Sequence, residues 1–173
     1  MEPQRFKIAL VPIGAVEANV VDDLARALAG VFLSSVSVRA MLPIPPGSYA
    51  PERDQYASPV FLMCANTARQ HAGELILGVT DVDLFVPDLS FVFGQASPSE
   101  RAAVISLFRL RDFQVEVFLE RTIKETVHEL GHVLGLSHCE NPDCVMFFSN
   151  RLADTDRKSS RFCDRCAAEL ERR

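Results

Sequence analysis

The alternation of apolar and polar positions divides the first half of the chain into short strands and an amphipathic helix. Two largely apolar runs, residues 6–13 and 74–80, have the length of buried strands and border on turn-forming residues. Between them, residues 16–29 repeat apolar side chains at helical spacing with acidic residues on the other face, and residues 31–38 return to a strand pattern. This half of the chain therefore predicts strands that alternate with helices.

The middle of the chain is less regular. A proline-rich connection over residues 43–51 leads into residues 52–71, which we predict to be helical in two pieces broken at Pro59. Residues 90–93 predict a short strand, and residues 102–110 predict the strongest strand of this region. The mixture of strands and helices thus continues through the middle of the chain.

A long helical pattern follows from about Gln114 to Leu134, with one apolar and one charged face and no proline. Residues 167–173 predict a short terminal helix. The total length of 173 residues is that of one domain with a sizeable core. No apolar run approaches the roughly 20 residues that a membrane span needs. We therefore expect one globular domain and no membrane partner.

Composition and charge narrow the class of partner. Hydrophobic residues make up 48% and charged residues 24% of the chain, and the net charge is −5. Because no basic stripe with interleaved aromatic residues occurs, we expect no nucleic-acid partner. The N-terminus has no charged region followed by a long apolar core, so we predict a cytoplasmic protein without a signal peptide. No long heptad pattern demands a second subunit, which favours a monomer.

Three of the four histidines lie within His-Glu-Leu-Gly-His-Val-Leu-Gly-Leu-Ser-His, residues 128–138. His128 and His132 are four residues apart, so on a helix they share one face and reach one metal ion together. Gly135 can adopt a positive φ that ends the helix sharply, and the chain then offers His138 as a third nitrogen ligand. Three protein ligands leave one zinc position open, which is the pattern of a catalytic site.

Glu129 follows the first of these histidines and can accept a proton from a water that the metal activates. The pattern H-E-x-x-H-x-x-G-x-x-H is the metzincin form of the zinc-peptidase signature. A short His-Glu-x-x-His match often arises by chance on a surface helix, but the extended form rarely does. We therefore interpret this segment as a catalytic zinc site.

Four of the five cysteines follow this motif with the spacing C-x4-C and then C-x2-C: Cys139, Cys144, Cys163 and Cys166. Four sulfurs around zinc form a closed tetrahedral site, so we predict a structural zinc that folds the C-terminal tail. Disulfides or free thiols are the alternatives. Clustered cysteines in a cytoplasmic chain favour metal, and no strand pattern precedes Cys163 as it does in a redox C-x-x-C pair. We interpret Cys64 as a buried small hydrophobic residue.

The whole arrangement, H-E-L-G-H-V-L-G-L-S-H-C-x4-C-V-M followed by C-x2-C, resembles the archaemetzincins, a branch of the metzincin zinc peptidases. The direct fusion of the third histidine to a cysteine, with three more cysteines downstream, separates it from matrix metalloproteases, astacins and adamalysins. Residues 78–85, 93–96 and 102–110 also resemble that family. The resemblance covers most of residues 5–170, and every ligand position is filled.

The resemblance implies a compact α/β (α+β) fold with a twisted mixed sheet, in a single domain over residues 1–173. The active-site helix would lie in about residues 1–135, and residues 136–173 would form a C-terminal part held by zinc. An edge strand, which we place within residues 102–110, would pair with an extended peptide substrate. The implied site comprises two zinc ions: one on His128, His132 and His138 with Glu129 as general base, and one on Cys139, Cys144, Cys163 and Cys166. Met146 would form the Met-turn, an apolar floor under the imidazoles.

We therefore predict a zinc metallopeptidase that hydrolyses peptide bonds through a zinc-activated water. An alternative is a catalytically silent or latent metzincin-like domain that binds peptides, but a pure binder has no evident use for the base Glu129. A zinc-stabilised nucleic-acid module is disfavoured by the acidic net charge. We assign no catalytic role to His71, and we interpret Asp81 and Asp83 as turn-forming residues.

Overall fold

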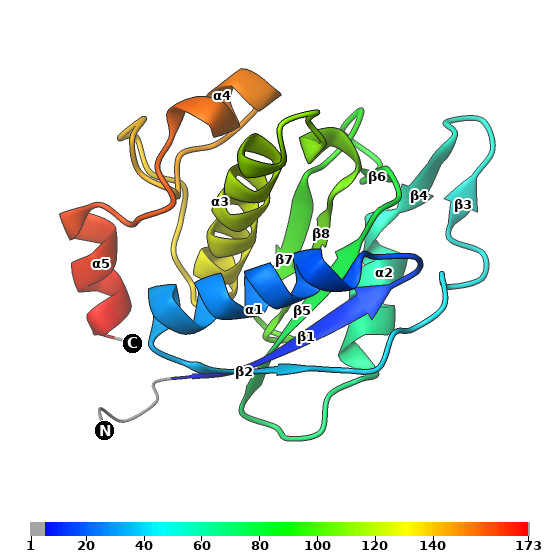
Figure 1. Ribbon diagram of the computed structural model, residues 1–173, viewed down its shortest axis with the longest axis horizontal. Coiled ribbons are helices and arrows are strands. Elements are labelled where there is room, and N and C mark those ends of the chain that lie inside the picture. The colour runs from blue at the N-terminus through cyan, green and yellow to red at the C-terminus, as the bar shows by residue number, and fades with distance from the viewer. Residues whose placement is uncertain (1–5, 173) are drawn as a thin grey trace.

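A five-stranded sheet forms the centre of the computed structural model, which describes residues 6–172 (Figure 1). Its strands are β1 (Lys7–Ile13), β2 (Ser35–Val38), β5 (Glu74–Thr80), β7 (Gly94–Ser97) and β8 (Ala102–Ser106). The order is β2-β1-β5-β8-β7. The first four strands are parallel, and β7 runs antiparallel to β8 at one edge.

Helices cover both faces of the sheet, because its strands carry apolar side chains on both sides. α1 (Ala18–Phe32) and α3 (Val115–Val133) lie on one face, and α2 (Ser58–Asn66) lies on the other (Figure 1). Alternate residues of β1 serve the two faces: Ile8 belongs to the core under α1 and α3, and its neighbour Ala9 to the core under α2. The result is a three-layer α/β/α arrangement.

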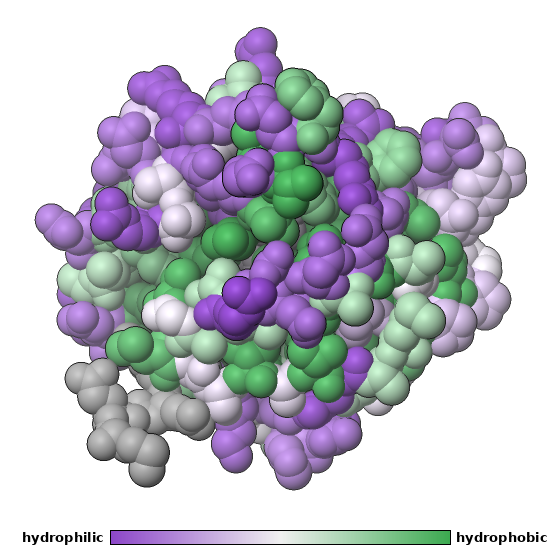
Figure 2. Space-filling view, viewed as in Figure 1, coloured by the Kyte–Doolittle hydropathy of each residue, from purple (hydrophilic) through white to green (hydrophobic). Residues whose placement is uncertain are grey.

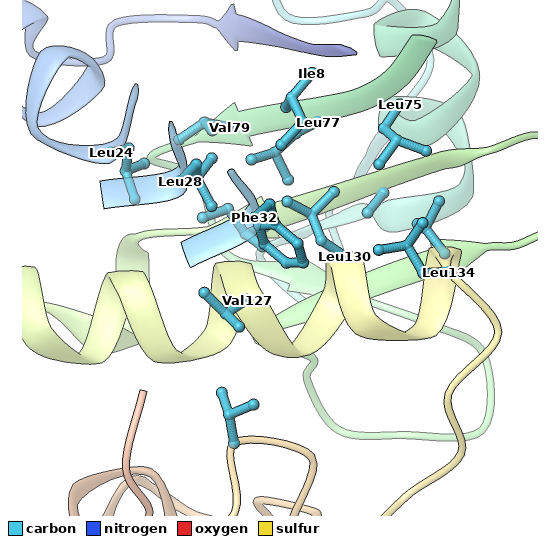
Figure 3. Packing of buried hydrophobic residues seen from close by; sticks show 14 of the residues in the cluster. Ile8, Leu24, Leu28, Phe32, Leu75, Leu77, Val79, Val127, Leu130 and Leu134 are labelled. Carbon is cyan, nitrogen blue, oxygen red and sulfur yellow. The ribbon is translucent and has the colours of Figure 1, made fainter. Parts of the chain in front are cut away.

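The larger core joins α1, the sheet and α3. Figure 3 shows Leu24 and Leu28 of α1 beside strand residues such as Leu77, with Val127 and Leu130 of α3 completing the layer. These five side chains are fully buried. Because α3 is packed on this core over its second half, the end of α3 has a fixed position relative to the sheet.

The remaining elements flank this sandwich. They are β3 (Tyr49–Ala50), β4 (Gln55–Ala57) and β6 (Leu84–Phe85) in a second small sheet, the 3₁₀ helix η1 (Phe108–Leu110), α4 (Leu152–Arg157) and α5 (Asp164–Glu171). The C-terminal part packs on the larger core through residues such as Val145 and Leu170. Figure 2 shows polar side chains around the rim of the face seen in Figure 1 and apolar ones toward its middle. Among residues 6–172, none of the helices is long and apolar enough to cross a membrane.

The predicted strand over residues 31–38 is wrong in its first half. α1 continues to Phe32 because that side chain lies one turn after Leu28 and is buried in the same core. Leu33 ends the helix with a φ of 48°, and the strand begins only at Ser35. The prediction for residues 74–80 is confirmed at both ends.

The predicted broken helix over residues 52–71 is also wrong. Residues 55–57 form β4, which pairs with distant β6, and a single helix occupies residues 58–66. Pro59 begins this helix instead of breaking it, because the first turn needs no backbone donor from it.

The prediction of an edge strand within residues 102–110 is wrong. β8 ends at Ser106 and pairs on both sides, with β5 and with β7, so it is not an edge. The edge strand next to β8 is β7, which lies four residues later than the short strand predicted at 90–93. Its sequence Gly-Gln-Ala-Ser has no apolar alternation, which is why the pattern missed it.

The two C-terminal helices lie close to their predicted positions. α3 covers residues 115–133, within one residue of the predicted ends. The terminal helix begins at Asp164 instead of residue 167, inside the C-x2-C pair, and runs to Glu171. Arg173, at the end of the prediction, lies outside the described residues.

Candidate metal centres and active-site cleft

The three motif histidines come together at the C-terminal end of α3. The helix ends at Val133, and Gly135 follows with a φ of 87°, which its missing side chain allows. The Leu136 N–H then donates to the Gly131 carbonyl at 2.9 Å, so the chain reverses and returns His138 to the other two histidines. The predicted turn at Gly135 is confirmed.

The ring nitrogens of these histidines converge. The Nε2 atoms of His128 and His132 are 3.1 Å apart, and the ring centre of His138 lies 4.6 Å from that of His132. Both helix histidines donate Nδ1–H to a backbone carbonyl at 2.8 Å, His128 to Val145 and His132 to Leu136, which leaves their Nε2 lone pairs available. Two nitrogens on a tetrahedral zinc lie about 3.3 Å apart for bonds of about 2.05 Å, so the spacing fits zinc.

The electrostatic environment keeps the three imidazoles uncharged at neutral pH. Burial is the largest cause that lowers their pKa values, and it acts most strongly on His128. The ammonium group of Lys158 also lowers the pKa of all three. An imidazole that has lost its second proton is the form that binds a metal ion.

Glu129 lines the same cavity as the histidines. Its side chain is buried, and this burial raises its pKa to about 8. The carboxylate of Glu125, one turn earlier on α3, raises the pKa of Glu129 as well, and Lys158 lowers it. Because a nearby dication favours the charged carboxylate, we expect metal binding to lower this pKa. A carboxyl group with a perturbed pKa beside three uncharged imidazoles suits proton transfer at a metal.

The histidines lie in a cleft that extends to both sides of them. A cavity of about 500 Å³ is lined on one side by residues 89–96, Glu129 and Phe148. A second cavity of about 460 Å³ is lined by residues 135–138. Both cavities are lined by Ala96 of the edge strand β7, His132 and His138, so they adjoin at the histidines, and we refer to the two together as the groove. A chain lying in this groove would pass directly over the candidate metal site.

The four predicted cysteines form a second cluster beside the first. Cys139 directly follows His138, and its sulfur lies 3.8 Å from the sulfur of Cys163. All four sulfurs lie within 4.8 Å of one another, and none forms a disulfide. An edge of a zinc–sulfur tetrahedron is about 3.8 Å long for bonds of about 2.3 Å. The cluster therefore fits a zinc ion held by four thiolates.

Hydrogen-bond donors surround these sulfurs. The backbone N–H of Cys166 is the main cause that lowers the pKa of Cys163 to about 7, and Arg165 Nη2 donates to Cys139 Sγ at 3.3 Å. Burial raises the pKa of Cys144 and of Cys166. Since α5 begins directly after Cys163, that thiol also lies at a helix N-terminus, which favours the thiolate that binds metal.

Comparison with known proteins identifies the family. The model of "Peptidase family M54" matches residues 66–172. A relative named Archaemetzincin from Pyrococcus furiosus is 41% identical, over 98% of this chain and 94% of its own. Another, from Methanopyrus kandleri, is 47% identical over 75% and 73% of the two chains. The chain belongs to peptidase family M54.

Solved structures agree with this assignment. The crystal structure of Archaemetzincin from Methanopyrus kandleri has a TM-score of 0.87 and 37% identity to this M54 member, covering 99% of this chain and 97% of that one. Archaemetzincin from Archaeoglobus fulgidus, complexed with malonate, has a TM-score of 0.86 and 39% identity, covering 95% and 99%. The predicted α/β fold and archaemetzincin resemblance are confirmed, and the protein is a zinc metallopeptidase.

Met146 of this M54 peptidase is buried against α3, the helix that carries His128 and His132. A Cβ atom at Gly131 would overlap with the Met146 sulfur, so the thioether lies directly on the backbone of α3. The Met146 carbonyl also accepts the N–H of Cys139 at 2.9 Å. The methionine thus connects the histidine helix to the start of the cysteine cluster.

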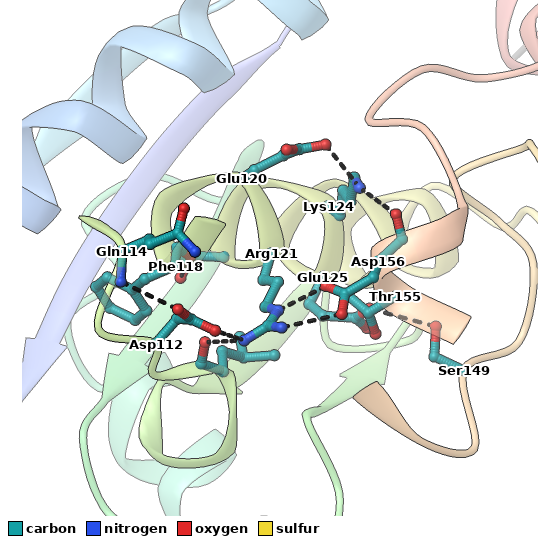
Figure 4. A network of polar contacts seen from close by, with 12 residues as sticks. Asp112, Gln114, Phe118, Glu120, Arg121, Lys124, Glu125, Ser149, Thr155 and Asp156 are labelled. Atoms are coloured by element: carbon teal, nitrogen blue, oxygen red, sulfur yellow. Dashed lines mark hydrogen bonds and ion pairs between the residues drawn. The ribbon is translucent and has the colours of Figure 1, made fainter. Parts of the chain in front are cut away.

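A buried ion pair beside the histidines could not be seen in the sequence. Lys158 is 1% exposed, and its Nζ atom lies 3.0 Å from Glu125 Oε1, 3.3 Å from the Phe147 carbonyl oxygen and 3.5 Å from His128 Nδ1. Glu125 also accepts a hydrogen bond from Thr155 Oγ1 at 2.8 Å (Figure 4). The pair therefore joins α3 to the segment that follows α4.

The acidic residues after β5 pair with arginine side chains, and within residues 6–172 neither carboxylate accepts a turn-capping hydrogen bond. Asp83 accepts two hydrogen bonds of 2.7 Å from Arg109, and Asp81 pairs with Arg111 at 2.7 Å. The Arg109 guanidinium also lies 4.3 Å above the ring of Phe91, which lines the cleft. The Asp83–Arg109 pair therefore supports Phe91 in one wall of the groove.

Proposed function

We propose that this zinc metallopeptidase holds its catalytic zinc on His128, His132 and His138 and uses Glu129 as the general base. The observation that carries this proposal is the convergence of three uncharged imidazoles and one buried carboxyl group where the two cavities adjoin. Zinc supplies a Lewis acid that lowers the pKa of water toward about 7 and polarises a carbonyl group.

Glu129 and the histidines have different roles in the proposed reaction. Glu129 accepts a proton from the attacking water and returns it to the amine that leaves when the peptide bond breaks. The carbonyls of Val145 and Leu136 hold the Nδ1 hydrogens of the two helix histidines and so fix their Nε2 atoms toward the groove. His138, which follows the turn at Gly135, provides the third of the proposed zinc ligands.

The edge strand β7 is the proposed binding edge for the substrate. The Ser106 N–H donates to the Phe93 carbonyl at 2.8 Å, which fixes the hydrogen-bonding phase between this strand and β8. In an antiparallel pair the hydrogen-bonded residues alternate, so the backbone groups of Gly94 and Ala96 point away from β8 toward the free edge. An extended peptide can add to these groups as a further strand and lie over the histidines.

A second zinc on Cys139, Cys144, Cys163 and Cys166 would be structural, because four thiolates leave no position for substrate. It would fix the segment from His138 to Met146, and with it the third histidine. We thus propose two zinc ions per chain.

Substitution of the base tests the catalytic assignment. Glu129→Gln should retain the fold and the zinc content and lower kcat by about 10²- to 10⁴-fold. Glu116→Gln, at an exposed position of the same helix, serves as the control and should behave as the wild type. A peptide library is digested with and without a zinc chelator. Unchanged turnover in Glu129→Gln would reject the base. Tight peptide binding without cleavage by the zinc-loaded wild type would favour the silent binding domain.

A further inference from the structure

Gly94, the first residue of the edge strand, touches the side chain of Glu129. A Cβ atom built on Gly94 would lie 2.6 Å from Glu129 Cγ and 2.9 Å from Glu129 Cδ. It would also lie 2.8 Å from the Val104 carbonyl oxygen of β8. Real Cβ atoms essentially never come this close to other atoms, so no other residue fits here without movement of the strand or of the glutamate.

Glycine is required at this position because there is no space for a side chain, not because of the backbone conformation. The glycines with positive φ are Gly14, Gly47 and Gly135, and Gly94 is not among them. Its backbone is therefore open to any residue, and only the neighbouring atoms exclude a side chain. Among these neighbours, Glu129 is the one with a chemical role in the proposed function.

Among residues 6–172, no side chain or backbone group forms a hydrogen bond with the Glu129 carboxyl group. The charged groups of Glu125 and Lys158 affect it through electrostatic interactions without a hydrogen bond. Its orientation therefore depends on what its methylene groups pack against. The backbone of β7 at Gly94 is the surface that lies directly on those methylene groups. The same strand presents the backbone groups of Gly94 and Ala96 to the proposed substrate.

We propose that Gly94 is a positioning residue: the bare backbone of β7 at Gly94 sets the direction of the Glu129 carboxyl group. The inference rests on the proposed function and adds a geometric reason for it. Because one strand both holds the peptide and supports the base, the scissile bond and the carboxyl group keep a fixed separation. A misplacement of about 1 Å in such a constellation lowers turnover by about 10²-fold.

The first test is Gly94→Ala in the full-length, zinc-loaded protein. We expect kcat to fall by about 10²-fold, KM to change by much less, and the zinc content to stay that of the wild type. A crystal structure of the variant should show the Glu129 carboxyl group turned away from its wild-type direction. Gly30→Ala, a helical position with no atom within 4 Å of an added Cβ, is the control and should keep full activity. Wild-type kcat in Gly94→Ala would overturn the proposal.

A stability cycle tests the contact without any reliance on turnover. Gly94→Ala should lower the Tm of the chain that carries Glu129 by about 3 °C more than it lowers the Tm of a Glu129→Ala chain, in which the clashing atoms are gone. A Gly94→Ala variant that unfolds, rescued by Glu129→Ala, would support the proposal as well. Equal losses in both backgrounds, or unfolding of both, would assign the clash to Val104 alone and overturn it.

The two experiments separate this inference from the proposed function. If the wild type is inactive but the Tm loss from Gly94→Ala is larger with Glu129 present, the contact between the two residues stands. Glu129 would then be rejected as a peptidase base, and with it the role of Gly94 in positioning a base. An active wild type with an uncoupled cycle would reject the role of Gly94 and leave the proposed function intact.

Discussion

Replacement of Lys158 by methionine is expected to destabilise the protein severely. The lysine side chain is completely buried, and the side chain of Glu125 that it pairs with is only 3% exposed. Methionine has a similar shape but no charge, so Lys158→Met leaves the Glu125 carboxylate buried without a cation. The hydrogen bond from Thr155 remains, but it supplies no opposite charge.

The magnitude follows from the cost of an uncompensated buried charge. Removal of one partner of a buried ion pair costs about 3–5 kcal/mol. For a domain of this size each kcal/mol shifts the Tm by about 2–4 °C, so the Tm should fall by about 6–20 °C. A loss of about 3–5 kcal/mol is a large share of the roughly 5–15 kcal/mol that a folded domain typically has as its free energy of unfolding.

The double variant Glu125→Gln/Lys158→Met is the matched control, because removal of both charges of a buried pair is often nearly neutral. Urea unfolding of the zinc-loaded proteins measures the free energy of unfolding of each variant. We expect Lys158→Met to lose several kcal/mol and the double variant to regain most of it. A single variant within about 1 kcal/mol of the wild type, or a double variant no better than the single, would refute this account of the pair.

Two further perturbations address the histidine site. Folding raises the pKa of Glu129 from 4.5 to about 8, so in the metal-free protein its stabilising contribution is present below pH 4.5 and is lost as the pH rises toward 8. The Tm of metal-free Glu129→Gln should therefore exceed that of the wild type by more at pH 8 than at pH 5, and a constant difference would contradict the buried carboxyl. Gly135→Ala should cost about 1–2 kcal/mol, because the φ of 87° is strained for alanine, and should weaken zinc binding through His138 in a chelator competition. Unchanged zinc affinity would show that the turn does not hold this ligand.

The candidate metal-binding residues could be predicted from the sequence because the pattern that indicates them is local. Two histidines one helical turn apart, a glycine that ends the helix and a C-x2-C pair need only a few residues of context. The structure brings these residues together: the Nε2 atoms of His128 and His132 lie 3.1 Å apart, and the sulfurs of Cys139 and Cys163 lie 3.8 Å apart.

The parts that depend on distant contacts could not be predicted. β4 is a strand because it pairs with β6, and no feature of residues 52–71 indicates that partner. The edge strand β7 has a small, polar sequence, so its place beside β8 is decided by pairing alone. Lys158 looks like an ordinary surface residue until the fold places it against Glu125, which is 33 positions away in the sequence. Sequence patterns record periodicity, whereas these features are set by tertiary contacts.

The most direct test of the central claim is a zinc count on the purified protein and on two variants, by elemental mass spectrometry. We predict two zinc ions per chain in the wild type, loss of one on His132→Ala with loss of peptidase activity, and loss of the other on Cys163→Ser. A wild type that keeps its full zinc content after His132→Ala would contradict the claim that the three imidazoles hold the catalytic ion.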